Sequence, residues 1–229
     1  MTQPASDDTV LRTSIGDFAL QEYRLRAGGR AWSVLHTDAV LTLDDEARFL
    51  DEHAPRLPYG VVLWPAAVAL AHDVAGRGAE LRGRRVLELG AGTGLPGIVA
   101  AALGAQVVQT DRQELALSVC RRNGARNGVA GVTYRAADWE VWDDAARYDA
   151  ILGADILYAE RLHPHLRRIF ETNLAPDGRV LLADPFRAPS VRLLEALDAD
   201  GWTVAMSRWN VGNDAAPRPV AVYDLAPPH

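Results

Sequence analysis

The stretch Val86-Leu-Glu-Leu-Gly-Ala-Gly-Thr-Gly-Leu-Pro-Gly97 decides the fold of this chain. It reads as a buried strand with an acidic residue near its end, then glycines at every second position, then a helix pattern. Glycine lets backbone N–H groups approach a ligand closely, because no side chain stands in the way. The stretch therefore predicts a ligand site where a strand turns into a helix.

Two classes of enzyme use such a turn, and the glycines fit both. Gly92, Gly94 and Gly97 satisfy G-x-G-x-x-G, which binds the pyrophosphate of a dinucleotide. Gly90, Gly92 and Gly94 satisfy the pattern hydrophobic-x-acid-x-G-x-G-x-G of methyltransferases that bind S-adenosylmethionine. Glu88 favours the second class, because its carboxylate would repel a pyrophosphate but attract a sulfonium and an ammonium.

Asp111 is the second clue to a nucleotide-like ligand. It ends the next apolar run, Gln106-Val-Val-Gln-Thr-Asp111. An acid at this place can accept hydrogen bonds from two ribose hydroxyls, whichever of the two cofactors is bound. A tight turn without any ligand is the alternative, and the acid-glycine-acid arrangement argues against it.

Strand and helix patterns alternate through the rest of the chain. Strands are predicted at 85–89, 106–110, 131–135, 148–154, 178–183, 202–207 and 219–225, and helices at 95–103, 113–123, 161–174 and 190–200. Such alternation predicts an α/β fold, with a mostly parallel seven-stranded sheet covered by helices on both faces. No helix pattern separates the last two strands, so we expect the last strand to be antiparallel.

The N-terminal part has a different pattern. Two short apolar runs around a Gly-Gly step within residues 14–37 predict a β-hairpin, and residues 44–53 read as a short acidic helix. We therefore expect residues 1–57 to form a tail, a hairpin and a helix packed on a core domain of residues 58–229. The hairpin is a candidate lid over a substrate.

Three further segments join the glycine turn in a resemblance to a known family. They are Tyr59-Gly-Val-Val-Leu-Trp-Pro-Ala-Ala67, Ala137-Asp138-Trp139 and Gly153-Ala-Asp-Ile-Leu-Tyr158. With the turn, they resemble the class I (seven-β-strand) S-adenosylmethionine-dependent methyltransferases, whose sheet is Rossmann-like. The Trp-Pro segment and the D-x-x-Y pattern are similar to the branch of protein lysine methyltransferases within that methyltransferase-like family. The resemblance covers roughly residues 57–225.

The resemblance implies a set of cofactor-binding residues. Asp138 would accept the exocyclic N–H of the adenine, with an aromatic side chain beside it. Trp64 would lie over the cofactor and attract its sulfonium by a cation–π contact, although a core tryptophan that anchors the following helix is an equal alternative. The full set is Trp64, Glu88, Gly90, Ala91, Gly92, Thr93, Gly94, Asp111, Arg112, Asp138, Trp139 and Ala154.

Asp155 and Tyr158 are the predicted catalytic residues. Methyl transfer is an in-line displacement that needs alignment, and a lysine nucleophile must first lose a proton. Asp155 would orient the amine and Tyr158 would accept or relay its hydrogen bond. The alternatives are an Asp155 that binds only the cofactor or a loop N–H, and a Tyr158 that packs in the core.

No metal ion is expected at this site. Asp155 and Asp184 end neighbouring strands and are able in principle to hold Mg²⁺, as in catechol-type O-methyltransferases. Those enzymes have an Asp-Asn pair at this edge of the sheet, and Pro185 replaces the Asn here.

Composition limits the partners. The net charge is −6, all 24 basic residues are arginine, and no basic run marks a nucleic-acid surface. No apolar run reaches the roughly 18 residues of a membrane span. The lone cysteine, Cys120, suits a reducing compartment, so we expect a cytoplasmic protein. The Asn/Asp-Pro-Pro-aromatic pattern of base and glutamine methyltransferases is absent after the fourth predicted strand.

These observations predict an S-adenosylmethionine-dependent N-methyltransferase that acts on a lysine side chain of a protein. The alternatives are a methyltransferase for a small-molecule amine, such as a metabolite or a pyridine, and a non-catalytic S-adenosylmethionine-binding module. A nicotinamide-dependent oxidoreductase is more remote. The sequence leaves the acceptor, the number of methyl groups and the oligomeric state open.

Overall fold

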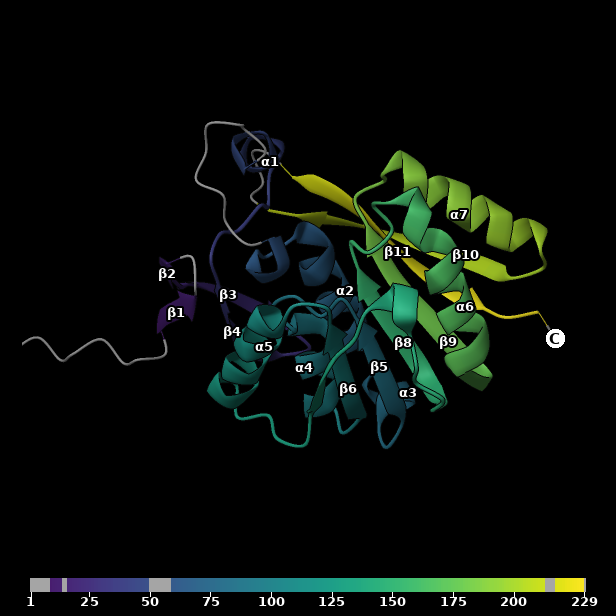
Figure 1. Ribbon diagram of the computed structural model, residues 1–229, viewed down its shortest axis with the longest axis horizontal. Coiled ribbons are helices and arrows are strands. Elements are labelled where there is room, and N and C mark those ends of the chain that lie inside the picture. Colours follow the sequence, from purple (N-terminus) through teal and green to yellow (C-terminus); the bar gives the residue numbers. More distant parts are fainter. Residues whose placement is uncertain (1–8, 14–15, 50–58, 213–216, 229) are drawn as a thin grey trace, which may run out of the picture.

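A single seven-stranded sheet runs through the computed structural model, which describes residues 9–13, 16–49, 59–212 and 217–228 (Figure 1). In spatial order its strands are β10 (Thr203–Val211), β11 (Arg218–Ala226), β9 (Leu174–Asp184), β8 (Tyr148–Ala154), β5 (Arg85–Leu89), β6 (Gln106–Asp111) and β7 (Thr133–Ala136). The five strands from β9 to β7 are parallel, and β11 is antiparallel to both of its neighbours. The predicted fold class is confirmed.

Helices cover both faces of this sheet. They are α2 (Pro65–Gly76), α3 (Gly78–Leu81), α4 (Leu95–Ala102), α5 (Glu114–Arg126), α6 (His163–Asn173) and α7 (Ala188–Ala199). Helices α2, α4 and α5 lie on one face and α6 and α7 on the other (Figure 1). A proline in the first turn starts α2, α4, α6 and α7, where its fixed φ suits the helix and its missing N–H has no partner to lose.

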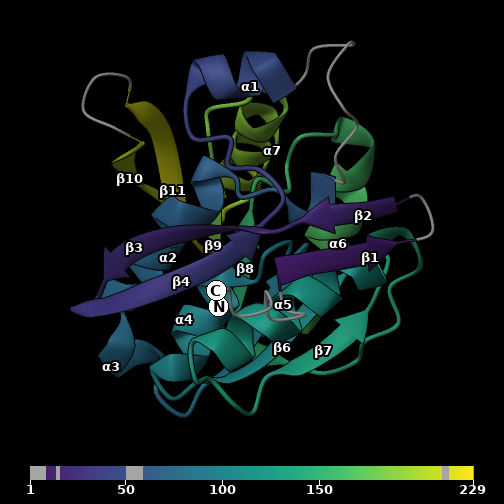
Figure 2. The same cartoon turned by 90° about the vertical axis from the view of Figure 1, so that its left-hand side faces the viewer.

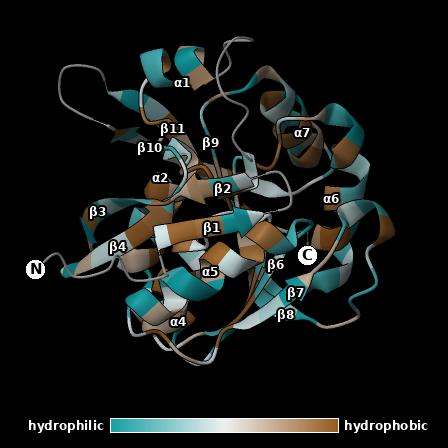
Figure 3. Cartoon of the chain, turned by 60° about the vertical axis from the view of Figure 1, so that its left-hand side comes forward, coloured by the Kyte–Doolittle hydropathy of each residue, from teal (hydrophilic) through white to brown (hydrophobic). Residues whose placement is uncertain are grey.

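Alternating side chains divide the core into two layers. On β5, Val86 packs toward α2 and α4, whereas Leu87 and Leu89 pack toward α6 and α7. The central strands are buried on both faces, as parallel strands between helices must be. The helices that cover the sheet are amphipathic: in Figure 3, α5 and α7 carry both hydrophilic and hydrophobic residues. No helix in the described part of the chain is long and apolar enough to cross a membrane.

The N-terminal segment contains two hairpins and a short helix. The predicted hairpin is confirmed as β3 (Gln21–Ala27) and β4 (Arg30–His36), and the predicted acidic helix as α1 (Leu43–Phe49). A second hairpin, β1 (Val10–Thr13) with β2 (Gly16–Ala19), was not predicted. The predicted tail, residues 50–53 of the predicted helix and the expected domain boundary at 57 lie outside the described residues.

The β3–β4 hairpin lies beside α5 (Figure 2), and the side chain of Asn123 on α5 joins the hairpin to the core. Its Oδ1 accepts from the Leu35 N–H at 2.7 Å, and its Nδ2 donates to the carbonyls of Leu35 and Thr93 at 3.0 and 2.9 Å. The hairpin therefore packs on α5, and its role as a lid stays a prediction.

Strand β9 begins four residues earlier than predicted. The Asp177-Gly178 step, where the predicted strand starts, is instead an irregularity inside the strand, with Asp177 at φ 61°. Tyr148 of β8 pairs with Leu174 and Ala150 pairs with Arg179, so β9 has extra residues at this place. A bulge can absorb such a turn-like pair without ending the strand.

The fold predicts opposite effects for two glycine-to-alanine substitutions. A Cβ at Gly97, in α4, would collide with the buried Glu88 carboxylate and lie 2.7 Å from Gln109 Nε2, whereas a Cβ at Gly76 meets nothing within 4 Å. We expect Gly97→Ala to lower the free energy of unfolding by about 2–3 kcal/mol. Gly76→Ala should leave it unchanged or raise it by about 0.5–1 kcal/mol.

Urea denaturation of the two variants and the wild type measures both effects. Equal stabilities for Gly97→Ala and Gly76→Ala would contradict the packing described for α4.

Candidate active site

A cavity of about 590 Å³ opens at the carboxyl ends of β5, β6 and β8. Its place is the point where the strand order reverses around β5, at which open α/β sheets bind ligands. Ten of the fourteen predicted site residues line it: Trp64, Gly90, Gly92, Asp111, Arg112, Asp138, Trp139, Ala154, Asp155 and Tyr158. The structure thus brings the two halves of the predicted site into one hollow.

The glycine turn forms one wall, and its residues have different roles. Gly90 and Gly92 line the cavity at φ 60° and 57°, in the left-handed region that favours glycine. A Cβ at Gly90 would be 3.1 Å from the Trp139 ring. Gly94 faces the interior, where a Cβ would meet Gln109 Nε2 at 2.8 Å and Cys120 Sγ at 2.9 Å. Gly90 and Gly92 therefore leave room for a ligand, whereas Gly94 leaves room for neighbouring side chains of the core.

Ala91, Thr93 and Gly94 belong to the turn but do not line the cavity. The Thr93 side chain is 2% exposed, and its carbonyl accepts from Asn123. These residues shape the backbone that a ligand would meet, and direct contacts from them stay a prediction.

Glu88 does not lie where we expected it from the sequence, which predicted that its carboxylate attracts the positive charges of a ligand. The side chain is 2% exposed and lies behind the turn rather than in the cavity. Its Oε2 accepts from Gln109 Nε2 at 2.6 Å and from the Gly97 N–H at 3.2 Å. Glu88 therefore fixes the position of α4 relative to β5 and β6. Because strand side chains alternate, it shares the face of Val86, which packs under α4.

Burial raises the pKa of the Glu88 carboxyl from 4.5 to about 8, although the hydrogen bonds from Gln109 and Gly97 act in the opposite direction. The folded state thus binds this proton more tightly than the unfolded chain does. The contribution of Glu88 to stability is therefore complete below pH 4.5 and is lost as the pH rises toward 8.

We expect Glu88→Gln to make the free energy of unfolding less dependent on pH. Between pH 5 and 8.5 the wild type should lose stability on the order of 4 kcal/mol more than this variant. Urea denaturation at several pH values measures the difference. Glu114→Gln, at a carboxylate that is 66% exposed, is the control and should follow the wild type. Parallel profiles for Glu88→Gln and the wild type would disprove the assignment.

Asp111 lies at the base of the cavity, at the end of β6. Its Oδ2 accepts from the Gly92 N–H at 3.1 Å and its Oδ1 accepts from the Gln113 N–H at 2.9 Å. Burial raises the pKa of this carboxyl, because few donors compensate its charge. Two hydroxyls of a ribose would supply such donors from the cavity side.

Asp138 and Trp139 form the next wall, beyond β7. One oxygen of Asp138 accepts from the Glu140 N–H at 3.0 Å and caps the short helix η3 (Trp139–Val141). Its carboxylate has further lone pairs for an amino group in the cavity. The Trp139 ring borders Gly90 and offers a flat apolar face, so this wall fits an adenine base.

Trp64 lies in the wall of the cavity and is only partly buried, so the contact with the cofactor stays a prediction. It precedes α2 and lines the cavity, and its ring is stacked on that of Tyr59 with centroids 6.3 Å apart. Phe49 of α1 packs edge-on against both rings, at 5.0 and 5.6 Å. Tyr59, in η2 (Tyr59–Val61), also lines the cavity and is 58% exposed.

Asp155 and Tyr158 lie at the other end of the cavity, after β8. Asp155 adopts φ 53°, and its N–H donates to the Ala183 carbonyl at 2.8 Å, which anchors it to β9. Its carboxylate is held by Arg187, whose Nε and Nη2 donate to the two oxygens at 2.7 and 2.8 Å. Tyr158 is 55% exposed, so it is not a core residue.

The sequence reading missed Arg187 and Glu46. Arg187 follows β9, and its Nη1 lies 3.4 Å from Glu46 Oε1 of α1. Glu46 Oε2 in turn accepts from Arg218 Nη2 of β11 at 2.5 Å. Glu46 and Arg187 line the cavity, as do Gly60, Gln113, Ala137, Ile156, Arg161 and Leu162. No sequence spacing relates α1 to β9, so only the fold reveals this chain of charges.

Asp184 is excluded from the cavity. It is fully buried, accepts from the Arg187 N–H at 2.7 Å and from the Ser190 hydroxyl at 2.5 Å, and burial raises its pKa. It therefore shapes the loop that carries Arg187. Among the described residues, no group of three or more His, Cys, Asp and Glu side chains is arranged to hold a metal ion.

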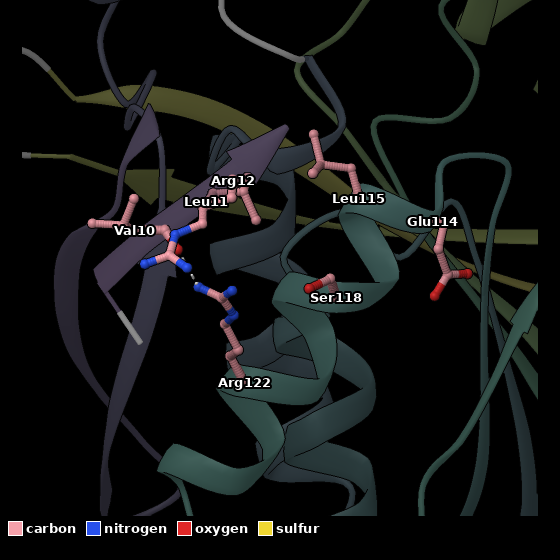
Figure 4. A pocket seen from close by; sticks show the side chains of 7 residues that line it. All are labelled: Val10, Leu11, Arg12, Glu114, Leu115, Ser118 and Arg122. Carbon is pink, nitrogen blue, oxygen red and sulfur yellow. Dashed lines mark hydrogen bonds between the residues drawn. The ribbon is translucent and has the colours of Figure 1, made fainter. Parts of the chain in front are cut away.

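A smaller hollow of about 330 Å³ lies between β1 and α5 (Figure 4). It is lined by Val10, Leu11, Arg12, Glu114, Leu115, Ser118 and Arg122. Arg122 Nη1 donates to the Val10 carbonyl at 2.8 Å across it. No predicted site residue lines this hollow.

The chain is similar to several curated proteins. The chain is 40% identical to protein N-lysine methyltransferase METTL21A of Xenopus tropicalis over 58% of its length and 63% of that protein. It is also 40% identical to METTL21A of Danio rerio over 67% of its length and 73% of that protein. EEF1A lysine methyltransferase 3 of Mus musculus is 36% identical over 58% of this chain and 59% of that protein. The chain thus spans less than two thirds of two of these relatives.

Solved structures show the same fold at lower identity. A 16S rRNA N2 G1207 methyltransferase of T. Thermophilus aligns with a TM-score of 0.60 at 19% identity, over 92% of this chain and 51% of that one. The N-methyltransferase NodS of Bradyrhizobium japonicum, in complex with S-adenosylhomocysteine, aligns with a TM-score of 0.58 at 16% identity, over 80% and 96%.

The fold, the glycine turn and the cavity together form a candidate site for S-adenosylmethionine. A family described as lysine methyltransferase matches residues 47–190. The chain belongs to this family, and the resemblance stated from the sequence is confirmed. The cavity fits the cofactor, because left-handed glycines leave room beside Trp139, and the Asp111 and Asp138 carboxylates face it as acceptors.

We expect Asp111→Asn to weaken binding of S-adenosylhomocysteine by about tenfold or more, because hydrogen bonds to a charged acceptor are lost. Isothermal titration calorimetry measures this affinity. Asp198→Asn, at an exposed position on α7, is the matched control and should bind like the wild type. Unchanged affinity in Asp111→Asn would place the ribose elsewhere.

Proposed function

We propose that this protein transfers a methyl group from S-adenosylmethionine to the side-chain amine of a lysine in another protein. One observation carries the proposal: a glycine turn and a carboxylate-tyrosine pair, Asp155 with Tyr158, line the same cavity. A cofactor site and a polar acceptor site are thus adjacent, as a direct displacement requires.

The residues of the chain bind, orient and shield the reactants. When bound, S-adenosylmethionine supplies an electrophilic methyl group on a sulfonium. Asp111 and Asp138 hold the nucleoside end, and Gly90 and Gly92 let the backbone reach the amino-acid end. Trp64 presents an aromatic face toward the cavity, where it attracts positive charge and excludes water.

Asp155 aligns the nucleophile. A carboxylate paired side-on with a guanidinium uses one lone pair on each oxygen, so each oxygen keeps another for an amine N–H. The Tyr158 hydroxyl, at the mouth of the cavity, is a second partner for that amine. The lysine must be neutral when it reacts, because an ammonium has no lone pair to attack the methyl group.

The names of the relatives support a protein acceptor. Two are described as protein N-lysine methyltransferases, and a third as a lysine methyltransferase of EEF1A. Others are described as histone-arginine methyltransferases, so arginine is the rival acceptor. An exposed Tyr59 and Tyr158 at the mouth suit an acceptor that a macromolecule presents from outside.

We also propose a cytoplasmic location. The lone cysteine, Cys120, is free and buried, which suits a compartment that keeps thiols reduced. Fractionation of cells that produce the chain, with detection by antibody, tests this proposal.

Incubation of the purified protein with methyl-tritiated S-adenosylmethionine and extract of its source organism tests the function. We expect a discrete labelled protein band that yields methylated lysine on hydrolysis. Label in methylated arginine, or only in small molecules, would contradict the proposal. Because the chain contains no lysine, its own side chains cannot produce the methyl-lysine signal.

Replacement of Asp155 separates catalysis from cofactor binding. We expect Asp155→Ala to reduce labelling of the acceptor band by about 100-fold or more, because the nucleophile loses its orienting group. The affinity for S-adenosylhomocysteine should change little, because Asp111, Asp138 and the glycine turn remain. Asp198→Ala on α7 is the control. Full activity in Asp155→Ala would remove Asp155 from the mechanism.

A further inference from the structure

The Asp155 carboxylate already has a cationic partner. Arg187 binds it through two parallel hydrogen bonds of 2.7 and 2.8 Å, the strongest geometry that arginine offers to a carboxylate. The side chain of Asp155 is only 6% exposed and that of Arg187 28% exposed. The pair is therefore shielded from solvent at the point where the acceptor amine must arrive.

The backbone on both sides holds this pair in place. Asp155 has φ 53° and Phe186, next to Arg187, has φ 63°, so both strand ends turn through the left-handed region that non-glycine residues seldom adopt. The buried Asp184 carboxylate accepts from the Arg187 N–H and thereby fixes the start of its loop. The contact is built by the ends of two neighbouring strands and does not depend on a flexible surface side chain.

Glu46 and Arg218 extend the pair into a chain of alternating charges. Arg187 Nη1 faces Glu46 of α1, and Glu46 accepts from Arg218 of β11, whose side chain is 9% exposed. These four side chains, two carboxylates and two guanidiniums, carry no net charge together. Removal of Arg187 alone would leave two carboxylates, Asp155 and Glu46, facing the acceptor end of the cavity.

The other charged groups come from every wall of the cavity: Asp111 and Arg112 at the end of β6, Asp138 before η3, and Arg161 of the short helix η4 (Glu160–Leu162). The phenol side chains of Tyr59 and Tyr158 line it as well. Within the described part of the chain, Arg187 is the charged group that contacts the Asp155 carboxylate.

An uncompensated carboxylate beside an amine stabilises the ammonium form, which cannot accept a methyl group. We propose that Arg187 is a positioning residue that fixes Asp155 and offsets its charge, so that the cavity admits the acceptor amine in its neutral form. This inference rests on the proposed function, because it concerns the amine that is methylated. Asp155 then accepts a hydrogen bond from the amine without stabilising its ammonium form.

Binding of n-butylamine, which has the same chain and amine as a lysine side chain, tests the inference without knowledge of the acceptor protein. The affinity is measured by ligand-observed NMR at pH 7.5 to 9.5, with the protein saturated with S-adenosylhomocysteine. In the wild type we expect the affinity to rise by about tenfold per pH unit, because only the neutral form of an amine with a pKa near 10.4 binds.

Arg187→Gln should bind n-butylamine at least about tenfold more tightly than the wild type at pH 7.5 and should lose the pH dependence. Arg187→Lys, which restores the charge without the paired hydrogen bonds, should keep the pH dependence of the wild type. Arg192→Gln, at an exposed arginine of α7 that pairs with Glu160, is the matched control. The neutral probe n-butanol should bind all four proteins alike.

Three results would overturn the inference. They are a wild-type affinity that does not depend on pH, an Arg187→Gln profile equal to that of the wild type, and an Arg187→Lys profile equal to that of Arg187→Gln. The proposed function is judged separately, by transfer of tritium to lysine. Transfer by the wild type together with equal amine profiles would reject the role of Arg187 and leave the function intact.

Discussion

The hydrogen bonds of one buried carboxyl group hold the glycine turn in place, and the rest of the site depends on them. Glu88 accepts from the Gly97 N–H and from Gln109, which joins β5, β6 and α4 directly beneath the turn. Gly97 must be glycine because that carboxyl occupies the space of a Cβ. With this contact fixed, Gly90 and Gly92 present their backbone to the cavity at the reversal of strand order.

The two ends of the cavity follow different electrostatic rules. At the nucleoside end, Asp111 is a buried carboxylate whose pKa is raised, and hydroxyl donors from a ligand would relieve its burial. At the acceptor end, Asp155 has a guanidinium partner, and its charge is compensated before a substrate arrives. The first arrangement favours tight binding of a neutral diol. The second favours an amine that has already lost its proton, which is the form that reacts.

Local patterns made much of this structure predictable, and long-range contacts set the limit. The glycine turn, Asp111 and the D-x-x-Y pair were found because each lies within a few residues of a strand end. Glu46 and Arg187 are 141 residues apart and come into contact only in the folded protein, so no sequence motif predicted this contact. The Glu88 side chain lies behind the turn because side chains alternate along β5, and its charge alone did not indicate this direction. The β1–β2 hairpin carries a weak apolar pattern and was missed for that reason.

A crystal structure of the protein with S-adenosylhomocysteine would test the central claim, that one cavity holds both the cofactor and the acceptor site. The account predicts ribose hydroxyls within hydrogen-bond distance of Asp111, the adenine beside Asp138 and Trp139, and a sulfur atom that faces Asp155 while Asp155 remains paired with Arg187. A ligand bound outside this cavity, or one whose sulfur points away from Asp155, would contradict it.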